Sequence, residues 1–65
     1  MNGTAKLAPV LVSVEDAATA LGVRRTTAWE LVRSGALRST RIGARRLVPV
    51  AAIHEYAERL AGAEA

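Results

Sequence analysis

Arginine side chains dominate the groups in this sequence that could do chemistry, and most of them lie between residues 22 and 48. Seven arginines stand in that span, with Glu30 as its single acid: Arg24, Arg25, Arg33, Arg38, Arg41, Arg45 and Arg46. The span therefore carries a net charge of +6, while the rest of the chain, with two basic and five acidic residues, carries −3. A guanidinium can bind a phosphate or a guanine edge through two parallel hydrogen bonds. Because so positive a segment repels itself unless an anion lies against it, we expect a nucleic-acid partner rather than an ordinary solvated surface.

The sequence lacks the residues that metal sites, disulfides and most catalytic sites require. The chain has no cysteine and one histidine, His54, which excludes disulfides, thiolate metal sites and histidine-rich metal or catalytic sites. The adjacent acids Glu15 and Asp16 fit the start of a helix better than acid–base catalysis. No apolar run approaches the roughly 18 residues that span a bilayer, and the N-terminus lacks the pattern of a signal peptide. We therefore expect a soluble, cytoplasmic protein that is not an enzyme and takes no metal, cofactor, small-molecule ligand or membrane.

Two short helices joined by a tight turn are predicted to position the first arginines. Ser13 followed by Asp16 is close to a capping box, and the apolar residues from Val14 to Leu21 fall on one helical face, up to a stop at Gly22. A second helix is predicted from Arg25 to Ser34, ended by Gly35. This pattern is typical of a helix-turn-helix, whose second helix reads DNA with its N-terminal residues.

A hairpin is predicted to position the remaining arginines. Leu37 to Ile42 and Arg45 to Val48 are two β-compatible runs that flank the two-residue turn Gly43-Ala44. This register puts Arg41 directly opposite Arg46, a destabilising pair of like charges that a polyanion lying against it would explain. We interpret the hairpin as a wing.

The flanking segments complete a predicted winged helix-turn-helix fold, mainly α with a small β-hairpin wing. A short strand begins at about Val10, and Pro49 precedes a third helix from Val50 to Leu60 with an apolar stripe of Ile53, Tyr56, Ala57 and Leu60. Glu55 and Arg59 have the i, i+4 spacing of a helical ion pair. The expected organisation is a flexible segment over residues 1–9, a DNA-binding domain over 10–60 and a frayed tail over 61–65.

The candidate DNA-binding residues come from the reader helix and the wing. They are Arg24, Arg25, Thr26, Thr27, Trp29 and Arg33 in the former, and Arg41, Arg45 and Arg46 in the latter. Arginine can bond guanine, threonine can bond a phosphate or pack on a thymine methyl, and the wing arginines can enter a narrow minor groove. Trp29 has two interpretations of equal weight: a partly buried core aromatic, or an indole N–H that reaches a phosphate.

The apolar N-terminal segment is a candidate for contact between neighbouring copies of the protein. Leu7, Val10 and Leu11 extend the first strand upstream without a charge. A flat, apolar strand edge is a template for pairing with another chain, and copies held on DNA could pair cooperatively. The alternative is that Leu7 and Val10 cover the protein's own small core.

The segment from Leu11 to Leu60 resembles the small excisionase family of phages and integrative elements, a branch of the MerR-like winged helix group. The similarity rests on the acid-capped first helix, Gly22-Val23, the basic helix ending in Ser34-Gly35, the wing from Arg41 to Arg46, and Pro49. Two departures are Arg24 where the family has a serine cap, and Trp29 where the family has a tyrosine.

The resemblance implies a DNA-bending architectural protein that assists an integrase in excision, a recombination directionality factor acting at the nucleoid of a bacterial host. The same module occurs in small MerR-like transcriptional regulators, which leaves a regulator as an alternative. A third possibility is a protein-interaction module whose basic face meets an acidic partner.

Overall fold

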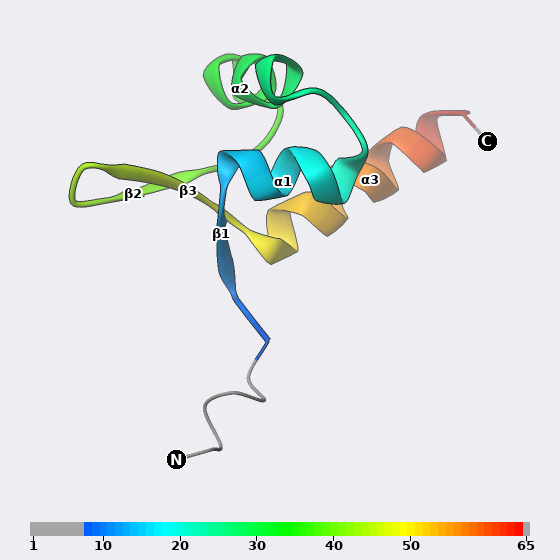
Figure 1. Cartoon of the computed structure of the whole chain (residues 1–65). Helices are drawn as coiled ribbons and strands as arrows, with labels where there is room; N and C mark the ends of the chain where they lie inside the picture. The colour runs from blue at the N-terminus through cyan, green and yellow to red at the C-terminus, as the bar shows by residue number, and fades with distance from the viewer. Residues whose placement is uncertain (1–7, 65) are drawn as a thin grey trace.

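The computed structural model describes residues 8–64, which form three helices and three short strands (Figure 1). In chain order the elements are β1 (Leu11–Ser13), α1 (Val14–Leu21), α2 (Arg25–Ser34), β2 (Thr40–Ile42), β3 (Arg45–Pro49) and α3 (Val50–Glu64). The strands form one antiparallel sheet in the order β1-β3-β2. We call the β2–β3 hairpin, residues 40–49, the wing. The predicted fold class, mainly helical with a small β-hairpin wing, is confirmed.

Helix α1 begins and ends where the sequence predicts. The Ser13 hydroxyl accepts a hydrogen bond from the Asp16 backbone N–H at 2.9 Å, which caps the first turn. Gly22 follows the last turn with a φ of 74°, the left-handed conformation that glycine adopts without strain. The buried face of α1 consists of Val14, Ala17 and Ala18.

Helix α2 covers the predicted residues, but the chain after it takes a different course. No side-chain hydrogen bond is made at its N-cap, Arg24, as expected where arginine replaces serine. The predicted strand from Leu37 starts instead at Thr40, because the Leu37 backbone N–H donates to the Leu31 carbonyl at 3.0 Å. This bond turns the chain back, so that the Leu37 side chain is buried in the core.

The wing has the predicted register. Arg41 pairs with Arg46 and Ile42 with Arg45 across the Gly43-Ala44 turn. Gly43 has a φ of 60°, as the first position of a two-residue type II′ turn requires. On the other side of β3, Val12 pairs with Val48, which makes β1 the third strand of the sheet.

The core is small and consists mostly of small side chains. Its buried members are Val14, Ala17, Ala18, Ala28, Leu37, Val48, Ala52 and Ile53. Trp29, Leu31, Val32 and Tyr56 are among the half-buried residues that pack against it. The alanines of α1, α2 and α3 let α2 and α3 each approach α1 closely, so that α2 is held over α1 with its outer face exposed (Figure 1).

Helix α3 is longer than predicted and is buried over only its first turns. It continues to Glu64, four residues beyond the expected end at Leu60, in keeping with the high helix propensity of its alanine-rich end. Ala52 and Ile53 are buried, whereas Ala57 is exposed and Leu60 is 49% exposed. The predicted apolar stripe is therefore wrong in its second half, because the C-terminal half of α3 projects past α1 (Figure 1). Within residues 8–64, no helix combines the length and apolar character that crossing a bilayer requires.

Candidate nucleic-acid interface

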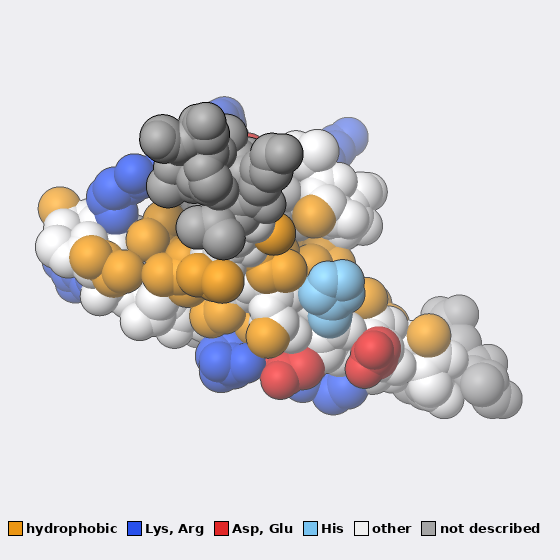
Figure 2. Space-filling model, turned by 90° about the horizontal axis from the view of Figure 1, so that it is seen from below, with side chains coloured by type: hydrophobic (Ala, Val, Ile, Leu, Met, Phe, Trp, Pro, Cys, Tyr) orange, Lys and Arg blue, Asp and Glu red, His pale blue; other side chains and the backbone are white. Residues whose placement is uncertain are grey.

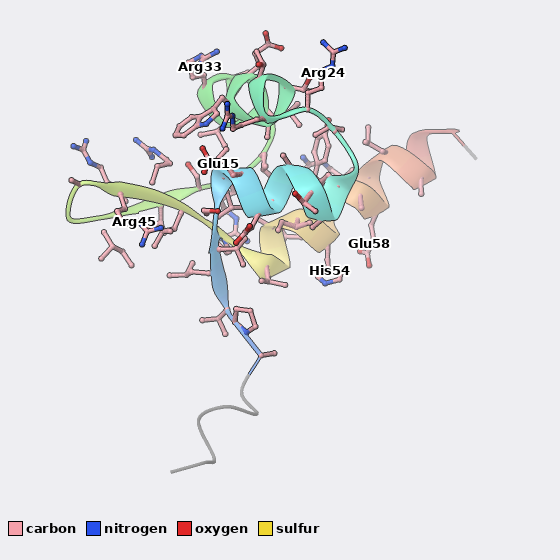
Figure 3. All side chains as sticks on the ribbon, viewed as in Figure 1. Glu15, Arg24, Arg33, Arg45, His54 and Glu58 are labelled. Carbon is pink, nitrogen blue, oxygen red and sulfur yellow. The ribbon has the colours of Figure 1, made fainter. Side chains whose placement is uncertain are left out.

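The outer face of α2 carries the first group of candidate residues. Arg24 and Arg33 lie at opposite ends of the helix and point away from α1 (Figure 3). Arg25 and Thr26 are also exposed, while Thr27 is half-buried. No acid stands in the first turn, and no side chain caps it. The backbone N–H groups of that turn and the arginines beside it therefore face solvent as one positive surface.

The wing arginines divide between the two faces of the sheet. Residues paired across antiparallel strands share a face, and successive residues alternate. Arg41 and Arg46 thus share the face of buried Val48, which is the face that the helices cover. Arg45 lies on the opposite face with Ile42. The structure therefore brings Arg41 and Arg46 to the side of α2 and turns Arg45 away from it.

Trp29 lies where the first of its two interpretations, a partly buried core aromatic, would place it. Its ring is half-buried and packs against the core. Its indole N–H donates to the Glu15 carboxylate at 3.4 Å, which links α2 to the first turn of α1. Since the indole has a single donor, a phosphate contact would require this hydrogen bond to break. The observed geometry supports the core interpretation.

Sequence reasoning missed the contacts that join the base of the wing to α3. One Nη of Arg38 lies 3.2 Å and 3.3 Å from the two carboxylate oxygens of Glu55. Arg59 donates to the Ala36 carbonyl at 2.7 Å and lies over the Tyr56 ring, 5.7 Å from its centroid. The predicted pair of Glu55 with Arg59 is therefore wrong, because both side chains make their hydrogen bonds with residues outside α3. These partners lie 17 and 23 residues away in sequence, and no local pattern signals them.

The underside of the molecule differs from the side of α2. A band of hydrophobic side chains runs along the sheet, and acidic side chains and the histidine lie over α3 (Figure 2). The part of the chain that the structure describes contains no buried polar or charged residue, no group of three potential metal ligands and no detected pocket. The arrangement is therefore one of exposed surfaces rather than of an enclosed site.

The residues predicted to join neighbouring copies lie at the start of the sheet. Strand β1 is an edge strand, with β3 on one side. Val10 is 76% exposed and Leu11 is half-buried, so Val10 does not cover the core as the alternative would have it. Leu7 lies outside the described residues.

Comparison with known proteins gives two matches of this chain. The family model described as "Helix-turn-helix domain" matches residues 11–61. A "Probable excisionase" of Saccharopolyspora erythraea is 51% identical over 51 residues, which are 78% of this chain and 52% of that protein. The chain thus spans about half the length of this curated relative. No solved structure matches significantly.

Proposed function

This chain belongs to the family of helix-turn-helix domains, and on that premise we propose that it binds double-stranded DNA sequence-specifically. Helix α2 enters the major groove, and the wing follows the adjacent minor groove. The observation that carries the proposal is the pairing of Arg41 with Arg46 on the same side of the molecule as the exposed arginines of α2. Like charges held directly opposite each other cost stability in the free protein, and a DNA backbone removes that cost.

The proposed contacts divide into reading and positioning. Arg25, with Thr26 and Thr27 beside it, reads base edges from the N-terminal turns of α2, because base contacts specify sequence. Arg24 and Arg33 bind phosphates at the two ends of the helix. Arg41 and Arg46 bind phosphates of the strand that borders the minor groove on the side of α2. Arg45 faces the DNA strand on the opposite side of the minor groove. Trp29 supports the reader helix from behind through Glu15.

The salt dependence of affinity tests DNA binding against an acidic protein partner. If about five arginines neutralise phosphates, log affinity falls against log salt concentration with a slope of about −4.5. A slope near −1 would contradict the proposal and favour a protein-interaction module.

Substitutions test the division of labour between helix and wing. Arg25→Ala is expected to relax the preference for the cognate site over scrambled DNA, since it removes a base contact. Arg46→Ala is expected to weaken all sequences alike. Competition binding measures both, and unchanged discrimination in Arg25→Ala would reject α2 as the reader.

We further propose that the protein acts as an excisionase, in the bacterial cytoplasm at the nucleoid. Its likeness to the relative described as a probable excisionase supports this role. In it, the protein bends attachment-site DNA and assists an integrase without itself making or breaking a bond. Position-dependent mobility of circularly permuted DNA fragments, and excision in vitro with the integrase, test it. Bound DNA that stays straight, together with control of a promoter, would favour the alternative of a small MerR-like regulator.

Leu7, Val10 and Leu11 are proposed to join neighbouring copies on DNA. The exposure of Val10 and the edge position of β1 support this contact. A strand pairing of this size is feeble in solution, but DNA raises the effective concentration of neighbours. The contact therefore predicts cooperative binding to tandem sites and a monomer away from DNA.

A further inference from the structure

Residues 35–39, which we call the connector, join the reader helix to the wing. All three residues of β2 are exposed, so the wing projects from the body of the protein (Figure 1). The course of the connector therefore helps to set the direction in which the wing leaves α2, together with the pairing of β3 with β1. Buried Leu37 anchors its middle to the core.

Helix α3 holds the connector at two further points, on either side of Leu37. Arg59 donates to the Ala36 carbonyl at 2.7 Å, and Glu55 accepts from Arg38 at 3.2 Å and 3.3 Å. Glu55 and Arg59 are one turn apart on one face of α3, so that both can face the connector.

The far end of the connector is fixed to the wing itself. Arg46 of β3 donates to the Ser39 hydroxyl at 3.3 Å. Contacts at Ala36, Arg38 and Ser39 thus run in sequence from the end of α2 to the start of β2. The connector is held along its length, although it contains no helix or strand.

We propose that Glu55 and Arg59 are positioning residues, which set the angle and distance between the reader helix and the wing from a helix that lies outside the proposed DNA contacts. The inference rests on the proposed function for its purpose, because two elements that enter neighbouring grooves need a fixed separation. It also explains why Arg38 is paired with an acid, unlike the other arginines of the basic segment. Through this pair, Arg38 fixes the connector to α3.

A distance measurement between spin labels tests this geometry without DNA. The chain has no cysteine, so Glu30→Cys on α2 and Ala44→Cys at the wing tip, both exposed positions, accept two labels alone. The variant Glu55→Met/Arg59→Met removes the acceptor of the Arg38 contact and the donor of the Ala36 contact, and leaves the net charge unchanged. Glu58→Met is the control, because this neighbouring exposed acid has no hydrogen bond or ion pair among the described residues.

The double variant should show a broader and shifted distribution of label distances, and the control an unchanged one. Circular dichroism at the measuring temperature must show that both stay folded, since a merely structural role would lower stability without widening the folded-state distribution. An unchanged distribution in the folded double variant overturns the inference.

DNA affinity of the same variants tests the purpose of the positioning separately. The double variant is expected to lose about three- to tenfold, the scale of coupling between residues in contact. Arg46→Ala is expected to cost less in that background than in the native chain. A broadened distribution with unchanged affinity supports the positioning of the wing but rejects the wing's proposed role on DNA.

Discussion

Replacing Arg41 by glutamine is expected to stabilise the free protein and to weaken its binding to DNA. Arg41 stands directly opposite Arg46 in the wing, on the same face of the sheet. It makes no hydrogen bond or ion pair among the described residues, whereas Arg46 bonds Ser39. Arg41→Gln therefore removes the repulsion without removing a stabilising contact.

The size of the gain follows from the register. Directly opposed side chains across antiparallel strands have Cβ atoms about 4.5–5.5 Å apart, and such pairs change stability by about 0.2–1 kcal/mol. For a domain of this size, 1 kcal/mol shifts the melting temperature by about 4–8 °C. The expected rise is thus about 1–8 °C at low salt. It should vanish near 1 M salt, where the Debye length falls to about 3 Å.

Thermal unfolding followed by circular dichroism measures this gain, and Arg45→Gln is the matched control. Arg45 is the same residue type in the same hairpin, but it faces Ile42 and no opposed charge. It should show little or no rise. On DNA, Arg41→Gln should reduce the magnitude of the salt slope by about 0.9. Equal melting shifts in the two variants, or undiminished DNA affinity in Arg41→Gln, would refute the reasoning.

Three further substitutions or deletions test other parts of the structure. Ser13→Ala removes the cap of α1 and should lower the free energy of unfolding by about 1 kcal/mol in urea denaturation. An unchanged free energy of unfolding in this variant would count against the observed hydrogen bond. Leu37→Ala should cost about 2–5 kcal/mol in the same assay, while Leu60→Ala, at a half-exposed site, should cost little. Deleting residues 1–9 should abolish cooperativity on tandem DNA sites but leave single-site affinity and the melting temperature intact. Lost stability with retained cooperativity would instead assign that segment to the core.

Local chemistry explains why much of the fold could be predicted from the sequence. The cap at Ser13 and the helix ends at Gly22 and Gly35 depend on residues a few positions apart, and all three are observed. The wing register follows from its two-residue turn, since turn type fixes which residues face each other. The reader-helix and wing arginines could therefore be assigned to their elements before the structure was known.

The remaining features depend on contacts distant in sequence. The position of Leu37 reflects a hydrogen bond to α2 and a place in the core, which override its fitness for a strand. The i, i+4 spacing of Glu55 and Arg59 was informative about their shared face of α3 but not about their partners. Leu60 matches an apolar stripe, yet nothing in the described chain lies over it closely enough to bury it. These features depend on which helices and strands pack against each other, and the local sequence pattern does not determine that packing.

The fold thereby divides the eight arginines into two groups, which differ in whether they are held by contacts at the base of the wing. Arg38 and Arg59 bind groups of their own chain at the base of the wing. The other six lie at the N-cap of α2, on α2 or on the wing. None of the six has an acidic partner within residues 8–62, although Arg46 also bonds Ser39. If all six neutralise phosphates, the salt slope reaches about −5.4, whereas seven contacts from the basic segment would give about −6.3. A measured slope steeper than about −5.4 that returns to this value in Arg38→Gln would mean that Arg38 leaves Glu55 when DNA binds, and that the connector rearranges with it.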